Sequence, residues 1–330
     1  MSTVLGLRAW NMAFLGPVEI WYFSVFYLSL ATQFQVPILS ALALVVSLML
    51  YEAWGVLVND IYDREVDLAA GKSGVRRGHT LDPRLMWGLA LAAAAASWAL
   101  VLATDPTPVL VATWLVAYSL GILYSVPPFR FKNRGLLSLV CNSVLERPLP
   151  VLIIFLFFRY YGLETILFPI LSELVWSVFK HQVHDYDEDL KANVRTYAVQ
   201  IGRSLSYSIV RFVINPLGVL SVLAFAAAAA IKVPEYSSVF LASLGITVVG
   251  VAVLLILERL TLVYTDPLDP PYMLFLDFSF LVTVILALAT IVLVRQPTYL
   301  PLVALFILSL IPHLRYYLPM LGTVIHKVAA

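Results

Sequence analysis

Two short acidic clusters each follow a long apolar stretch of this chain. The first lies within residues 59–67, where Asn59, Asp63 and Asp67 recur every four residues. The second has Asp185 and Asp189 at the same spacing. Residues four apart fall on one face of a helix, with only modest drift per turn. We therefore expect each cluster to project oxygen ligands from one face of a helix end.

This arrangement of acidic residues favours a divalent cation. Carboxylates stacked on one helix face repel each other, and a bound cation offsets that repulsion. Mg²⁺ prefers carboxylate and water oxygens and typically joins protein carboxylates to substrate phosphates. The clusters predict a Mg²⁺ site that holds a diphosphate, with ligands drawn from Asn59, Asp63, Asp67, Asp185 and Asp189.

Other interpretations of the acidic clusters are weaker. Solvated loop charges are one, but two clusters with the same helical spacing favour a shared role. A Ca²⁺ loop requires the EF-hand spacing with its glycine, and a nucleotide-driven pump requires a GxxxxGK[ST] loop; the sequence has neither. A cation-coupled transporter is a further alternative, although transporters usually bind ions near the bilayer midplane on broken helices.

The composition indicates an integral membrane protein. Of the 330 residues, 61% are hydrophobic and 12% are charged, which is too little charge for the surface of a soluble domain. The apolar residues form blocks of about 20, the length that a helix needs to cross a bilayer. Cys141 is the single cysteine, which excludes an internal disulfide, and nothing indicates binding of nucleic acid. We expect an all-α, multi-pass protein in the lipid bilayer, with residues 1–330 as one domain.

Ten apolar stretches are predicted to span the membrane, the last of them an additional C-terminal one. They cover residues 13–33, 36–58, 84–104, 108–124, 136–158, 164–182, 206–231, 236–258, 273–294 and 298–317. The loops after the second, fourth and sixth stretches are rich in Lys and Arg, whereas the loops between them are poor in both. By the positive-inside rule, the basic loops, both acidic clusters and the N-terminus with Arg8 face the cytoplasm.

Four segments of the chain resemble motifs of a known family. Residues 59–67 match the NDxxDxxxD motif of the UbiA superfamily of intramembrane prenyltransferases, and residues 185–189 resemble its second motif, DxxxD. Residues 191–202 (KANVRTYAVQIG) are similar to the KxGxRTxAVxxG sequence that follows that motif. Residues 124–132 (YSVPPFRFK) look like the YSxPPxRxK sequence after the fourth span. The resemblance covers roughly residues 10–295.

The resemblance implies a bundle of nine helices around a central cavity, closed by cytoplasmic helix-loop caps; the additional span would make ten. It implies that Mg²⁺ and the two motifs bind a prenyl diphosphate, which ionises to an allylic carbocation that an acceptor attacks. We expect transfer to a lipophilic or aromatic acceptor. The residues expected to act in catalysis are Asp63, Asp67, Asp185, Asp189, Lys132 and Tyr124.

Further residues in or near the motifs are predicted to bind the substrate. They are Asn59, Asp60, Tyr62, Lys72, Arg77, Arg130, Lys191 and Arg195. Arg suits bidentate contact with phosphate, and Lys acts as a point charge. The alternative for each cation is that cytoplasmic loops are basic regardless of function. Tyr62 and Tyr124 are the preferred ring faces for stabilising a carbocation, while most other Trp and Tyr residues are expected at the membrane interface.

Four charged residues interrupt the apolar stretches: Glu52, Glu146, Arg147 and Glu173. Charges within a membrane are costly and usually face a cavity or a partner. Because Glu146 and Arg147 are adjacent, they are not expected to face each other on one helix; pairing of Glu52 with Arg147 is an alternative. A role for Glu52 or Glu173 in orienting the acceptor, or as a base, is a hypothesis.

The chain also departs from the family pattern. Residues 72–80 lack the prolines of the family's RPxPxG-like stretch, and His181 and Gln182 replace an Asn-Asp pair. Asn193 stands where the family usually has Gly, but Asn tolerates the left-handed conformation, so we expect the turn to survive. These departures leave the predicted diphosphate site intact and the acceptor open. A membrane terpene cyclase, which uses the same diphosphate site without an acceptor, is the alternative function.

Overall fold

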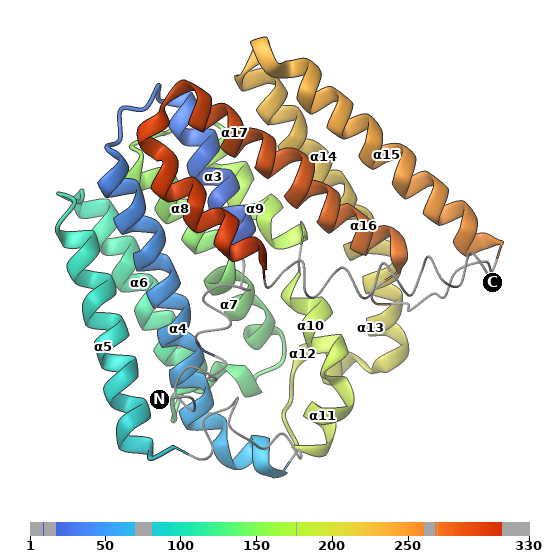
Figure 1. Cartoon of the computed structure of the whole chain (residues 1–330). Coiled ribbons are helices and arrows are strands. Elements are labelled where there is room, and N and C mark those ends of the chain that lie inside the picture. The colour runs from blue at the N-terminus through green and yellow to red at the C-terminus, as the bar shows by residue number, and fades with distance from the viewer. Residues whose placement is uncertain are drawn as a thin grey trace.

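The computed structural model describes residues 18–69, 81–175, 177–260 and 270–311, together with Ala9 and Leu268. Within these ranges the chain is almost entirely helical (Figure 1). An isolated parallel bridge between Gly135 and Thr196 is the β pairing seen there. The predicted all-α fold class is therefore confirmed.

The helices follow one another along the chain with short connections. They are α3 (Val18–Ala31), α4 (Ile38–Ala69), α5 (Pro83–Leu102), α6 (Pro108–Ser125), η2 (Phe131–Asn133), α7 (Leu136–Glu146), α8 (Pro148–Phe157), α9 (Glu164–Val175), α10 (Val178–His184), α11 (Tyr186–Lys191), α12 (Tyr197–Ile201), α13 (Arg203–Ile209), η3 (Val210–Ile214), α14 (Asn215–Lys232), η4 (Pro234–Tyr236), α15 (Ser237–Arg259), α16 (Pro271–Ser279), η5 (Phe280–Ile285), α17 (Leu286–Arg295) and η6 (Pro297–Tyr299). Two of the helix starts show the expected signals: the side chains of Asp82 and Thr107 cap α5 and α6, and a proline follows each.

Seven segments in the described part of the chain are long and apolar enough to cross a membrane. They are Ile38–Leu68, Pro83–Leu102, Pro108–Ser125, Leu136–Phe157, Arg203–Lys232, Pro234–Arg259 and Pro271–Arg295. The other predicted spans correspond to α3, to the pair α9 and α10, and to a shorter apolar helix over Pro297–Ile311. A multi-pass architecture is thus supported, and the count of nine to ten spans stays a prediction.

The predicted span at 136–158 is interrupted at Arg147. Helix α7 ends at Glu146 and α8 begins at Pro148, because proline lacks the backbone N–H and clashes with the preceding turn. Arg147 has φ −132° and ψ −56°, outside the helical range. The expectation that Glu146 and Arg147 do not face each other was wrong: Arg147 Nη2 lies 3.0 Å from Glu146 Oε1. The expectation assumed a continuous helix, which the proline prevents.

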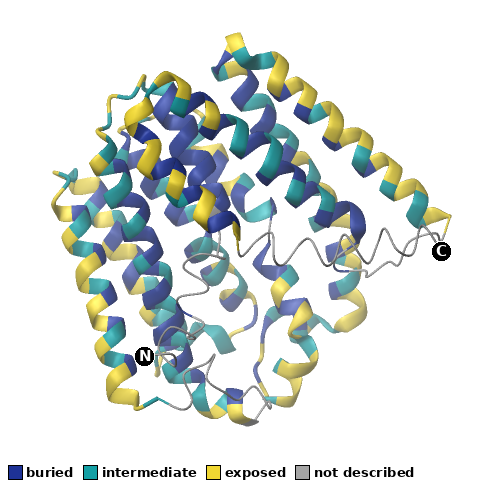
Figure 2. Ribbon diagram, viewed as in Figure 1, coloured by how far each residue is buried: buried dark blue, intermediate teal, exposed yellow. Residues whose placement is uncertain are grey.

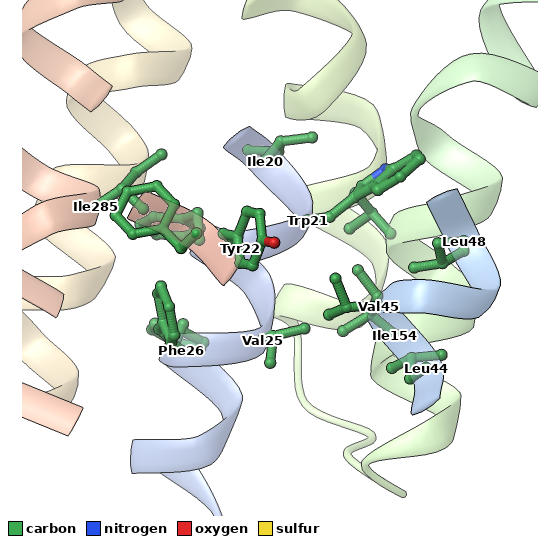
Figure 3. Packing of buried hydrophobic residues seen from close by; sticks show 14 of the residues in the cluster. Ile20, Trp21, Tyr22, Val25, Phe26, Leu44, Val45, Leu48, Ile154 and Ile285 are labelled. Atoms are coloured by element: carbon green, nitrogen blue, oxygen red, sulfur yellow. The ribbon is translucent and has the colours of Figure 1, made fainter. Parts of the chain in front are cut away.

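Helix α3 forms the centre of the bundle. The side chains from Glu19 to Leu30 are all buried, which agrees with a helix that is apolar all round. Its residues pack against α4, α8 and η5, as the buried cluster in Figure 3 shows with Leu48, Ile154 and Ile285. The outer helices are different, since α5 and α15 present exposed apolar side chains on the outside of the bundle (Figure 2). Such a surface suits contact with lipid.

The short helices α10 to α12 lie at the same end of the bundle as the C-terminal end of α4 (Figure 1). A separate small cluster of buried residues joins them to η3, through Phe179, Val183, Ala198 and Val210. The bridge between Gly135 and Thr196, with Gly135 N donating to the Arg195 carbonyl at 2.9 Å, ties this group to the start of α7. Both acidic clusters therefore belong to one end of the molecule.

The turn after α11 ends that helix with a left-handed residue. Asn193 has φ 55°, as expected for an Asn in the place of a Gly. The Asn193 N–H donates to the Leu190 carbonyl at 3.2 Å, and the Val194 N–H donates to the Asp189 carbonyl at 2.8 Å. These are the two hydrogen bonds of a Schellman motif, so the predicted survival of the turn is confirmed.

Glycine allows close approach of two helices at the contact between α14 and α9. A Cβ added at Gly218 would lie 3.0 Å from the backbone oxygen of Leu174 and 3.3 Å from Met273 Cε. Small residues at such contacts are typical of helix packing in membranes. On the exposed face of α15, by contrast, a Cβ at Gly245 meets nothing within 4 Å.

The Gly218 contact predicts a substitution that lowers stability. We expect Gly218→Leu to destabilise the protein by about 1–3 kcal/mol, because overpacking forces the two backbones apart. Gly245→Leu is the matched control and should leave the thermal midpoint unchanged or slightly raised. The measurement is thermal unfolding of the purified proteins in detergent; equal midpoints for the two variants would contradict the contact.

The Schellman turn predicts an order of stability at position 193. Asn193→Gly should be tolerated, because Gly adopts positive φ without penalty. Asn193→Val should lower the free energy of unfolding by about 1–2 kcal/mol, the approximate penalty for a left-handed conformation in a residue with a full side chain. Thermal unfolding together with limited proteolysis between α11 and α12 would show the difference, and a Val variant as stable as the Gly variant would refute it.

Candidate functional site

The first acidic cluster lies on the last turns of α4. This helix is 32 residues long and continues past its apolar part, so Asn59, Asp63 and Asp67 lie along one of its faces, as predicted. Asp63 is 1% exposed and Asp67 is 6% exposed. Asp60 is also buried, on a neighbouring face of the helix. Buried carboxylates need compensating partners, and the geometry around Asp63 shows them.

A turn after α6 folds back onto the first cluster and supplies two cations. Arg130 Nη2 lies 3.0 Å from Asp63 Oδ1, and Lys132 Nζ makes an ion pair with Asp63 Oδ2. Lys132 Nζ also lies 3.5 Å from Asn59 Oδ1. Arg130 adopts the left-handed conformation, with φ 35° and ψ 60°, which allows the sharp turn before η2. The YSVPPFRFK segment and the first acidic cluster thus form one structural unit.

The second acidic cluster lies where two short helices meet. Asp185 is the last residue before α11 and follows α10 directly, and its carbonyl accepts a hydrogen bond from the Asp189 N–H at 2.8 Å. This bond preserves the helical four-residue spacing between the two aspartates. Unlike the first cluster, Asp185 is exposed and Asp189 is half-buried.

One cavity joins the two clusters. It has a volume of about 430 Å³ and is lined by Asn59 and Asp67 from α4 and by Asp185 and Asp189 from the second cluster. Lys132 and Tyr124 line it as well. Six of the residues predicted to act at the site therefore share one cavity, although they come from segments that are far apart in the sequence.

The other predicted site residues lie elsewhere. Asp63 is not among the residues that line the cavity; it is paired with Lys132, which lines it, and with Arg130. The Tyr62 ring packs edge-on against Trp87, with ring centres 5.8 Å apart, and does not line the cavity. The remaining described residues, which are also not among those lining the cavity, are Asp60, Arg130, Lys191 and Arg195. Lys72 and Arg77 fall outside the described residues.

The donor set of the cavity fits a hard divalent cation. Asn59, Asp67, Asp185 and Asp189 present only oxygen acceptors, apart from one amide nitrogen, and such ligands suit Mg²⁺. Among the described residues, no three acidic, His or Cys side chains converge on one point closely enough to hold a metal ion without further ligands. The carboxylates instead line a shared space, which matches a cation that takes part of its coordination from a substrate phosphate.

Aromatic residues form another wall of the cavity. Tyr51 and Trp54 of α4 line it beside Tyr124. Behind Trp54 lies Tyr118, with ring centres 4.4 Å apart. Gly121 leaves room for this arrangement, because a Cβ there would lie 2.9 Å from two atoms of the Trp54 ring. Ring faces on a cavity wall stabilise cations and exclude water.

The intramembrane charges divide into two groups. Glu52 and Glu146 line the cavity, whereas Glu173 does not. Glu173 Oε1 accepts hydrogen bonds from the Val178 backbone N–H at 2.8 Å and from Ser143 at 3.0 Å, so it caps the start of α10. Among the described residues, Arg147 forms ion pairs with Glu146 and, at 3.8 Å, with Glu173.

Sequence reasoning missed several residues of the cavity wall. Asn142 and Tyr51 line it without belonging to a matched motif, and His181 and Gln182 line it from positions first noted only as departures from the family. For Asn142 a signal existed: it precedes Glu146 by four residues, which places both on one face of α7. Tyr51 lies eight residues before Asn59, which is close to the same helical face.

Comparison with known proteins agrees with this geometry. Among characterised proteins, the 2-acylphloroglucinol 4-prenyltransferase of Humulus lupulus is 24% identical over 161 residues. This match covers 44% of the chain and spans 37% of that relative's length.

Solved structures show the same fold at low identity. A UbiA homolog from Archaeoglobus fulgidus bound to DMAPP and Mg²⁺ is 18% identical, with a TM-score of 0.56, over 84% of this chain and 96% of that chain. A structure described for digeranylgeranylglyceryl phosphate synthase is 13% identical, with a TM-score of 0.52, over 86% and 99%. The model of the UbiA prenyltransferase family matches residues 20–281, which is most of the sequence. The chain belongs to the UbiA prenyltransferase family.

Proposed function

We propose that this protein transfers a prenyl group from a prenyl diphosphate to a lipophilic acceptor and requires Mg²⁺. The observation that carries the proposal is the single cavity lined by both acidic clusters, Lys132 and an aromatic wall. The archaeal homologue, which shares the fold, is described as bound to DMAPP and Mg²⁺, and a second structure of it as bound to GPP and Mg²⁺. The relative from Humulus lupulus is named as a prenyltransferase of an acylphloroglucinol.

The acidic end of the cavity binds the diphosphate in this proposal. Asn59, Asp67, Asp185 and Asp189 hold Mg²⁺, which when bound neutralises the diphosphate and improves it as a leaving group. Lys132 lines the cavity, and in this proposal its ammonium group contacts a phosphate oxygen. Asp63 fixes Lys132 in place through their ion pair, so its role is to position Lys132 as well as to complete the acidic cluster.

The aromatic wall serves the second half of the reaction. Once the bond between the allylic carbon and the diphosphate oxygen breaks, the positive charge on the prenyl group needs stabilisation without exposure to water. The ring faces of Tyr51, Trp54 and Tyr124 supply this at the cavity wall. A carbon or oxygen atom of the acceptor then forms the new bond and the acceptor loses a proton.

The orientation in the membrane follows from the basic residues. Arg130, Lys132, Lys191 and Arg195 lie at the end of the bundle that holds the acidic clusters, and the positive-inside rule places this end in the cytoplasm.

The orientation is tested by labelling single cysteines. Cys141 is the single cysteine and is buried. A Cys141→Ala variant therefore provides a background without thiols into which single cysteines are introduced. Arg134 precedes α7 and Tyr161 follows α8, so the span candidate Leu136–Phe157 separates them and puts Tyr161 at the end opposite the acidic clusters. In intact cells, a membrane-impermeant thiol reagent should label Tyr161→Cys but not Arg134→Cys. Opening the cells should make Arg134→Cys reactive, and labelling of Arg134→Cys in intact cells would reverse the orientation.

The reaction is tested by incubating the purified protein with Mg²⁺ and prenyl diphosphates of several lengths, with and without aromatic acceptors. We expect Mg²⁺-dependent diphosphate release and a prenylated acceptor. A cyclic hydrocarbon formed in the absence of acceptor would show that the protein cyclises the prenyl group and does not transfer it. A folded protein that releases diphosphate from none of the substrates would refute the site assignment.

The two acidic clusters predict a matched pair of substitutions. Asp67→Asn and Asp185→Asn keep side-chain volume but remove a charge from opposite walls of the cavity, and each should lower kcat by about 100-fold or more, because electrostatic groups of this kind contribute about that much. Thermal midpoints should change little. Wild-type turnover in both variants would contradict a mechanism that uses the two clusters together.

A further inference from the structure

Helix α7 presents a polar face to the cavity, apart from the acidic clusters. Asn142 and Glu146 both line the cavity and are four residues apart, so their side chains follow each other along one face. Glu146 ends α7, about 15 Å along the helix from its first residue, at a rise of about 1.5 Å per residue. The start of α7 lies next to η2 and Lys132, so Glu146 lies on the part of the wall farther from the diphosphate end.

Arg147 holds the Glu146 carboxylate in place. Arg147 Nη2 lies 3.0 Å from Glu146 Oε1, and the Arg147 side chain is 6% exposed. The helix break at Pro148 gives Arg147 the backbone conformation that lets it reach its neighbour. Arg147 Nη1 also lies 3.8 Å from Glu173, which caps α10. Glu146 is therefore fixed by a network that needs no substrate.

A carboxylate kept at this depth calls for an explanation, since charges within a membrane span are costly and usually serve a site. Glu146 is a carboxylate whose charge Arg147 offsets, and it brings no cation to a cavity that already holds Asp67, Asp185 and Asp189, so it does not help to bind the diphosphate. The Arg147 contact uses part of the hydrogen-bonding capacity of the carboxylate, which accepts about four hydrogen bonds. Its remaining capacity suits a hydrogen-bond donor on a molecule inside the cavity.

We infer that Glu146 and Asn142 bind a hydroxyl group of the acceptor, and that Arg147 positions Glu146 for this contact. This inference rests on the proposed prenyl transfer. The acceptor then belongs to the class of phenols or enols, in which a hydroxyl group lies near the carbon or oxygen that forms the new bond. Glu146 accepts a hydrogen bond from the hydroxyl, while Asn142 can accept or donate. Because Glu146 lies at the end of α7 away from Lys132, this contact places the two substrates on different parts of the wall.

The test compares substrates and variants in the purified protein with Mg²⁺. The probes are a panel of hydroxylated aromatic acceptors that includes an acylphloroglucinol, each paired with its fully O-methylated form. The wild type should prefer the hydroxylated member of a pair. Glu146→Gln should raise the KM for the hydroxylated acceptor about tenfold, as expected for loss of a charge-assisted hydrogen bond, with the KM for the prenyl diphosphate within about twofold of wild type. Asn142→Leu should move the acceptor KM in the same direction.

The positioning role of Arg147 has its own measurement. Arg147→Leu should raise the acceptor KM as Glu146→Gln does. Arg147→Lys should raise the acceptor KM less, because Lys keeps the charge but not the fork of donors. The matched control is Glu235→Gln, which also removes a carboxylate paired with an arginine, here Arg295, outside the cavity. The control should leave both KM values unchanged.

The outcomes separate this inference from the proposed function. If the wild type prenylates an acceptor but Glu146→Gln shows unchanged acceptor KM and unchanged preference over the O-methyl form, the inference is wrong and prenyl transfer stands. The same holds if the diphosphate KM rises as much as the acceptor KM, since Glu146 would then act on both substrates. If the wild type releases diphosphate but forms only a cyclic hydrocarbon, both the proposed acceptor site and the proposed prenyl transfer are wrong. If it releases none, the diphosphate site itself is wrong.

Discussion

The pairing of Asp63 with Arg130 and Lys132 links the parts of the site to each other. A carboxylate that is 1% exposed costs several kcal/mol unless opposite charges compensate it. Two cations from the turn after α6 do so, and this draws the turn against the last turns of α4. As a result Lys132 lies on the cavity wall beside Asn59. Removal of Asp63 alone would leave two cations close together without their partner, so effects of that substitution mix chemistry with structure.

Interrupted helices place the functional groups. The break at Pro148 turns Arg147 toward Glu146, and the junction between α10 and α11 places Asp185 among the residues that line the cavity. Glu173 connects the break at Pro148 to a further break between α9 and α10, because it contacts Arg147 and caps the start of α10. In lipid, a continuous helix would satisfy the hydrogen bonds of its own backbone N–H and C=O groups more simply. Here a free backbone N–H at a helix end, that of Val178, instead holds a charged side chain, Glu173, in a defined position.

Periodicity and motif spacing were sufficient to predict the all-α class, the location of the apolar helices and the common face of Asn59, Asp63 and Asp67. The left-handed turn at Asn193 was also predictable, because it depends on a local preference of one residue type. The pairing of Glu146 with Arg147 was not, since the expectation followed from helix geometry and neglected the proline after it. Tyr62 shows a second limit: its position in the motif did not indicate that its ring packs against Trp87 on α5. Contacts between distant segments depend on packing that one sequence does not specify.

The charges on the cavity wall also bear on the order in which ligands enter. Three aspartates and three glutamates line the cavity, Asp67, Asp185, Asp189, Glu52, Glu146 and Glu188, against one lysine, Lys132. Like charges repel more strongly where water is scarce, so these carboxylates would repel a diphosphate that carries no cation. In the proposed function, Mg²⁺ would offset part of the negative charge of the diphosphate, and the cavity carboxylates would hold the metal. If the proposed function holds, the acidic cavity favours entry of the metal before or with the diphosphate, while Glu146 is held by Arg147 in the absence of either ligand.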